Sequence, residues 1–173
     1  MKNRNTAKFI SICAILAAFS IIFGKYLAIN VGENFRFSLE NLPILLAGIY
    51  LGPLAGAVVG AVADLVGCLL VGYAINPIIT LGAITVGFSS GIIRNSFKHK
   101  KLLSLLICIA FAHTVGSIFI KTMGLSLYYG SPFIPTLVWR CIIYFCTGSV
   151  EFLILYFLSK NQTFEKLMHQ IRF

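Results

Sequence analysis

One acidic side chain, Asp64, stands inside an apolar stretch that is long enough to cross a lipid bilayer. The stretch, residues 51–73, is otherwise apolar and rich in glycine. A carboxylate at membrane depth costs about 2.5–3.5 kcal/mol on insertion scales, so such residues are usually retained for a bound ligand or a transport pathway. A buried acid can also do no more than tie helices together through hydrogen bonds. Of the two interpretations we favour the binding of a solute.

Three cations are predicted to gather toward one face of the membrane, where they can hold an anionic ligand. Arg36 lies in a polar loop, Lys121 lies near the end of a later apolar stretch, and Arg140 lies about 7 Å inside the last one. Asp64 and His113 each lie about 16 Å from the opposite end of their own helix. This arrangement predicts a polar cavity that opens to one side of the membrane.

Aromatic side chains are predicted around the mouth of the same cavity, and they are Phe35, Phe37, Tyr73, Tyr128, Tyr129, Phe133 and Trp139. Belts of Trp and Tyr occur at membrane interfaces generally. Beside cations and an acid, however, they suit a ligand that is flat and aromatic at one end and anionic at the other. A ring can stack on them, a carboxylate can pair with an amino-pyrimidine edge, and Arg or Lys can hold carboxylates. Trp139 is the best candidate for a stacking wall, and a Trp that faces lipid is the alternative.

The composition predicts a membrane protein. Of the 173 residues, 58% are hydrophobic and 11% are charged, against about 25% charged in a globular domain, and the mean hydropathy is +0.92. The net charge of +9 comes from basic clusters between apolar runs, which indicates membrane topology and no nucleic-acid partner. Five scattered cysteines without CxxC spacing predict neither a disulfide framework nor a metal site.

Six apolar stretches predict an all-α membrane protein with six transmembrane helices in a single domain, residues 1–173. The second is short for a full crossing, so we expect it to be tilted or enclosed by its neighbours. Pro53 is expected at the start of the third helix, and the third helix is expected to end near Gly72. We expect no cleaved leader and an amphipathic tail at 160–173. The stretches are 7–29, 42–51, 53–72, 78–93, 102–125 and 136–159, with polar loops at 30–41, 72–77 and 126–135.

Basic residues predict the orientation. Three segments, 2–8, 94–101 and 160–172, hold 10 of the 14 Lys and Arg residues and fall on one side of six crossings. The positive-inside rule places that side, with both termini, in the cytoplasm. Lys25 is interpreted as a lysine that snorkels to the headgroups, and Glu151 as a structural acid with a buried neighbour.

Two short motifs allow other interpretations. Residues 87–91 match G-x-S-x-G, and His113 could act as the base of a hydrolase, but this motif needs a strand-to-helix turn and here lies within a helix. We therefore predict no enzyme activity, and the absence of a Walker lysine motif means that the chain does not itself use ATP in the usual way. Ala14 and Ala18, four residues apart, either pack within the chain or admit a helix of another protein.

The chain as a whole resembles the substrate-binding S components of energy-coupling factor (ECF) transporters. The resemblance is carried by six spans in about 175 residues, Ala14 and Ala18, the later Asn76 and Pro77, and the segments RFSLENLPILLAG (36–48) and GPLAGAVVGAVAD (52–64). The two segments are most similar to the folate-specific branch, although GPLAG-type segments also occur in branches for other vitamins.

The resemblance implies a function in the bacterial plasma membrane. S components capture a vitamin from outside and then dock on a transmembrane coupling protein driven by two ATPase subunits. The alanine pair of the family meets the coupling protein, which implies that role for Ala14 and Ala18. We therefore predict capture of folate without any cofactor, with another vitamin such as pantothenate or thiamine as the alternative. The predicted ligand-binding residues are Arg36, Phe37, Asp64, Asn76, His113, Lys121, Trp139 and Arg140.

Overall fold

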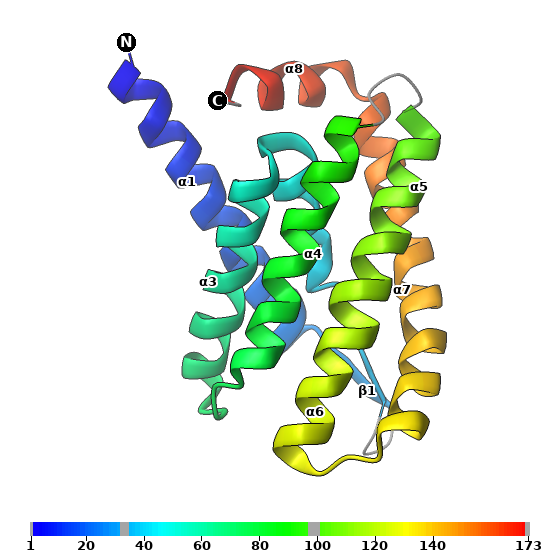
Figure 1. Cartoon of the computed structure of the whole chain (residues 1–173). Helices are drawn as coiled ribbons and strands as arrows, with labels where there is room; N and C mark the ends of the chain where they lie inside the picture. The colour runs from blue at the N-terminus through cyan, green and yellow to red at the C-terminus, as the bar shows by residue number, and fades with distance from the viewer. Residues whose placement is uncertain (1, 32–34, 97–100, 172–173) are drawn as a thin grey trace.

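A computed structural model describes residues 2–31, 35–96 and 101–171. Five helices in this part of the chain are long and apolar enough to cross a membrane, and a further apolar helix is shorter. They form one bundle in which α1 begins and α7 ends at the same end of the molecule (Figure 1). The helical elements of the bundle are α1 (Lys2–Ile21), η1 (Ile22–Tyr26), α2 (Asn41–Leu46), η2 (Ala47–Leu51), α3 (Pro53–Val71), α4 (Pro77–Ser96), α5 (Lys101–Ala112), η3 (His113–Ile120), α6 (Lys121–Tyr129) and α7 (Phe133–Lys160).

The segments labelled η are π-helical, and each continues an α-helix without a break. Thus α1 and η1 form one rod, as do α2 and η2, and α5, η3 and α6 together form the span Leu102–Tyr129. The sequence pattern predicted these continuous helices but not the π-helical turns within them. The reason is that the period of the apolar residues barely distinguishes an α-helical turn from a π-helical turn.

Two of the predicted loops differ from the structure. Residues 126–129 of the third loop are helical, because α6 continues to Tyr129. The first loop contains an antiparallel pair of strands, β1 (Ile29–Val31) and β2 (Phe35–Phe37), in which Asn30 faces Arg36. Residues 32–34, between the strands, lie outside the described part of the chain. The prediction of an all-α protein therefore holds for the spans and omits this small hairpin.

The short second helix is enclosed by its neighbours, as expected from its length. Ten of its eleven residues, Asn41–Leu51, are buried, with Leu46 the exception. The predicted amphipathic tail forms α8 (Gln162–Ile171), which lies across the end of the bundle (Figure 1). There Phe164 packs edge-on against Tyr50 of η2, with ring centroids 5.3 Å apart.

Helices α3 and α4 touch through their backbones. A β-carbon at Gly56 would collide with the carbonyl group of Gly87, and a β-carbon at Gly87 would collide with the backbone of Gly56. One turn further on, Gly60 lies in the same way against the carbonyl group of Ala83. Small residues at a spacing of four allow such close approach between membrane helices. The contact also fixes Asp64, the next residue of this series, beside α4.

We expect Gly56→Val to destabilise the protein by at least the 1–3 kcal/mol typical of overpacking, because the atoms it meets belong to a backbone that cannot move aside. A thermal unfolding scan of the purified protein in detergent measures the effect. Val58→Leu is the matched control, since Val58 lies on the same helix and is exposed. An unfolding midpoint within 2 °C or so of the control would show that the two helices can separate at little cost.

Candidate functional site

A polar cavity of about 430 Å³ lies at the end of the bundle that carries the hairpin, a size within the range of small-molecule sites. Its walls come from the helical elements η1, α3, α4, α6 and α7. The segment from β2 to the start of α2 contributes a further wall. Five of the eight predicted ligand-binding residues line it, namely Arg36, Asp64, Asn76, Lys121 and Arg140.

Asp64 and Asn76 differ in how far their polar atoms are already used. The Thr80 hydroxyl donates a 2.6 Å hydrogen bond to Oδ2 of Asp64, which leaves the carboxylate at the cavity wall with further acceptor capacity. Asn76 is 2% exposed, donates from Nδ2 to the carbonyl of Gly124 at 2.9 Å, and accepts at Oδ1 from the backbone of Ile78 at 3.0 Å. Asn76 therefore caps α4 and joins it to α6.

Lys121 is paired with an acid that the sequence analysis did not include. Nζ of Lys121 donates to Oε1 of Glu40 at 2.8 Å, and it lies 3.5 Å from Oδ1 of Asn41. Burial alone would raise the pKa of Glu40, but the charges of Lys121, Arg36 and Lys25 together lower that pKa to about 2. Glu40 is therefore a carboxylate at neutral pH, and part of the positive charge of Lys121 is compensated within the protein.

Arg140 is held in place by two contacts. Its Nε donates to the backbone carbonyl of Ser117 at 3.1 Å, and its Nη2 donates to the hydroxyl of Tyr144 at 3.1 Å. A guanidinium group has five N–H donors, so the remaining donors are available to a carboxylate. Tyr144 was not predicted, although its position four residues after Arg140 on one helix places both on the same face.

Lys25 also lines the polar cavity, where the sequence analysis had assigned it to the headgroup region. Its Nζ lies 3.9 Å from the sulfur of Cys68 and 5.3 Å from the centroid of the Tyr73 ring. Lys25 is in the last turn of η1, four residues before β1 begins.

A second cavity, of about 440 Å³, adjoins the first. The two share four lining residues, Arg36, Leu125, Arg140 and Tyr144, so the arginines stand at their junction. Trp139 lines only the second cavity and is 48% exposed. Among the predicted residues, Trp139 therefore lies beside the cations but apart from Asp64.

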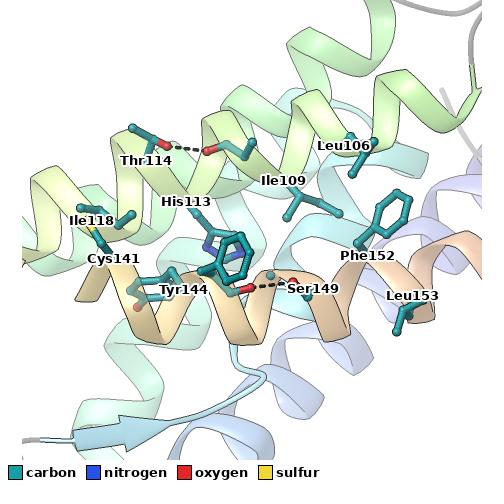
Figure 2. A pocket seen from close by; sticks show the side chains of 13 residues that line it. Leu106, Ile109, His113, Thr114, Ile118, Cys141, Tyr144, Ser149, Phe152 and Leu153 are labelled. Carbon is teal, nitrogen blue, oxygen red and sulfur yellow. Dashed lines mark hydrogen bonds between the residues drawn. The ribbon is translucent and has the colours of Figure 1, made fainter. Parts of the chain in front are cut away.

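His113 and Phe37 line neither of these cavities. His113 is buried and lies at an apolar groove between α5–η3 and α7, where its ring stacks on Tyr144 with centroids 5.0 Å apart (Figure 2). Its Nε2 lies 2.5 Å from Oε2 of Glu151. His113 is therefore the buried neighbour that the sequence analysis expected for Glu151. Phe37 follows Arg36 in β2, and successive side chains of a strand point to opposite faces.

Helix α1 presents its alanines in two directions. Ala14 and Ala18 are exposed, whereas Ala17 is 4% exposed and packs in the core. Packing within this chain therefore accounts for Ala17 and leaves the predicted pair on the outer surface.

Comparisons with known proteins agree on one family. A family model described as "ECF transporter, substrate-specific component" matches residues 8–164. A solved structure of FolT bound with folic acid is 25% identical, covers 88% of this chain and 93% of its own, and has a TM-score of 0.73. The S component for biotin from an ECF-type ABC transporter (20%, 93% and 95%, 0.70) and ThiT from Listeria monocytogenes (20%, 94% and 98%, 0.70) share the fold. No curated protein matches the chain.

Proposed function

Because this chain belongs to the family of substrate-specific components of ECF transporters, we propose that it captures folate from outside the cell and delivers it to a membrane-embedded coupling protein. The observation that carries the choice of ligand is the charge of the polar cavity. Its described lining includes four cations, Lys25, Arg36, Lys121 and Arg140, and two carboxylates, Glu40 and Asp64. Two positive charges remain, and a ligand with two carboxylates neutralises them.

The placement of the charges supports one orientation of folate. Arg36 and Arg140, at the junction of the two cavities, are the proposed partners of the two carboxylates of the glutamate tail. Asp64, fixed by Thr80, is the proposed acceptor for the amino-pyrimidine edge of the pterin ring. The similarity to FolT with folic acid agrees with this choice of ligand. Lys121 is assigned a smaller role than the arginines because Glu40 already neutralises it.

The proposed setting is the cell membrane, with six crossings and both termini in the cytoplasm. The short helix Asn41–Leu51 would be the sixth crossing, with the hairpin segment before it in the chain and α8 packed against it near its end through Phe164 and Tyr50. The basic segments support this orientation, although residues 97–100 and 172 lie outside the described part. The cavity then opens outward, and the exposed Ala14 and Ala18 lie on the surface proposed to meet the coupling protein, which two ATPase subunits would drive.

The alternatives have less support. Thiamine is a cation, and pantothenate carries a single carboxylate, so neither neutralises the net charge of the cavity. A hydrolase built on the G-x-S-x-G match lacks its geometry, because Ser89 and Ser90 are buried within α4 and donate to the carbonyl groups of Val86 and Gly87. These serines pack helices together.

Isothermal titration calorimetry of the purified protein against folate, biotin, pantothenate and thiamine tests the proposal. We expect folate to bind at least a hundredfold more tightly than the other three, because it alone offers both a dianionic tail and a large flat ring. A pterin absorbance band in protein purified without added ligand would agree with this result. Tighter binding of thiamine or biotin would contradict the proposed ligand and leave the family unchanged.

A further inference from the structure

A chain of buried polar side chains connects Glu151, deep in α7, to the cavity. From the cavity inward, Nζ of Lys121 lies 3.5 Å from Oδ1 of Asn41, and Nδ2 of Asn41 donates to Oγ of Ser117 at 3.3 Å. Oγ of Ser117 lies 3.3 Å from Nδ1 of His113, whose Nε2 meets Glu151. All five side chains are buried.

The pair formed by His113 and Glu151 also supports Arg140. The ring of His113 stacks on that of Tyr144, and the Tyr144 hydroxyl accepts from Arg140. Ser117, which contacts His113 through its hydroxyl, accepts from Nε of Arg140 through its carbonyl oxygen. Two cavity cations, Lys121 and Arg140, are thus linked to His113 by short paths.

Glu151 itself is too far from the cavity to contact a ligand there. It lies eleven residues beyond Arg140 on α7, which is about 16 Å along a helix. Its side chain is fully buried, its Oε1 has no hydrogen-bond partner among the described residues, and its one described hydrogen bond is to His113. An acid in the membrane interior is costly, and the hydrogen bond to His113 is the described interaction that offsets this cost.

The hydrogen-bond donors of this series of side chains, from Lys121 to Glu151, can all point in one direction. Lys121 only donates, so Asn41 accepts at Oδ1 and donates at Nδ2. Ser117 can then donate to Nδ1 of His113, which leaves the proton on Nε2 to donate to a Glu151 carboxylate. Hydrogen bonds arranged in series polarise one another in a low-dielectric interior, so an anion at the far end strengthens each bond back to the cavity.

We propose that Glu151 and His113 are positioning residues, which hold Lys121 and Arg140 in the orientation that binds the carboxylate tail of the ligand. The inference rests on the proposed function. It differs from a role in joining helices, because positioning of the cations affects the anionic tail of a ligand more than its ring.

The test compares folate with a pterin that lacks the carboxylate tail, using calorimetry on the full chain. For Glu151→Gln we expect the Kd for folate to rise about tenfold and the Kd for the tail-free pterin to change less than twofold. Ser117→Ala removes the hydroxyl but keeps the carbonyl oxygen that holds Arg140, and we expect the same selective loss at about threefold. Ser149→Ala is the control. It removes an exposed hydroxyl on α7 that donates to the Phe145 carbonyl, and it should change neither Kd.

The outcomes separate the possibilities. If Glu151→Gln does not fold, Ser117→Ala decides the question. Equal losses for the two ligands, or a lower unfolding temperature with both Kd values unchanged, would show that the pair only joins helices and would overturn the inference. Wild-type protein that binds no folate would overturn the proposed function and with it this inference, whereas wild-type binding with unaltered selectivity in both variants would overturn the inference alone.

Discussion

Ala18→Trp is expected to abolish vitamin uptake while leaving the Kd for folate within twofold of the wild-type value. Ala18 is exposed on α1 and lies apart from the residues that line the polar cavity, so an indole there has no route to the bound ligand. Small residues four apart work by letting a second helix come close, and a Trp at this position would hold that helix away. Uptake of labelled folate is measured in cells that contain the coupling protein and ATPases, and Kd is measured on the isolated subunit.

Cys146→Trp is the matched control for Ala18→Trp. Cys146 is a small, exposed residue of α7, and α7 lies on the opposite side of the bundle from α1 (Figure 1). It should retain both uptake and binding. Weaker binding by the Ala18 variant would mean that the alanine pair packs inside this chain, and normal uptake would place the docking surface elsewhere.

Arg140→Ala should weaken folate binding by tenfold to a hundredfold. A charge-assisted hydrogen bond contributes about 1.5–3 kcal/mol, and each 1.4 kcal/mol is a factor of ten in Kd. Arg140 stands at the junction of the two cavities, and two of its donors are fixed by Ser117 and Tyr144. Because the guanidinium group is already held in place, little order is lost when a carboxylate binds to its other donors. Calorimetry on the purified variant provides the measurement.

Two further variants make the result of Arg140→Ala specific. Arg140→Lys keeps the charge but loses the planar guanidinium group, so its Kd for folate should lie between that of the wild-type protein and that of Arg140→Ala. Lys160→Ala removes a cation of the same helix that lies over the Tyr156 ring, away from the cavity residues, and it should not alter binding. Unchanged affinity in Arg140→Ala would reassign the carboxylates of the ligand to other cations.

The positions of the helices were predictable from the sequence because residues such as proline and glycine mark where each apolar run begins and ends. Pro53 begins α3 and Gly72, with a φ of 74°, ends it, as the sequence indicated. The gathering of Arg36, Lys121 and Arg140 at one cavity was also predictable, since counting residues along a helix gives depth in a membrane.

The pairing of side chains was not predictable in this way. Depth along a helix does not define which face of the helix a residue occupies, so His113 was assigned to the polar cavity although it lies at a separate groove. Glu40 lies in a segment whose path depends on the hairpin, and no period in the sequence indicates that it meets Lys121, 81 positions later. Contacts of this range depend on the whole fold.

The π-helical segment η3 has a mechanical consequence. A π turn holds about one residue more than an α turn, so tightening it to α geometry would rotate everything beyond it by about 100°. Lys121 and the rest of α6 lie beyond η3, whereas α5 lies before it. A slip of one residue would turn Lys121 away from Glu40 and remodel the cavity wall, while the α3–α4 contact stayed locked. Such a slip would also turn Gly124 away from Ile78 and Ile79, where a β-carbon would crowd these side chains, so the packing of α6 on α4 holds the π-helical register that keeps Lys121 at the cavity.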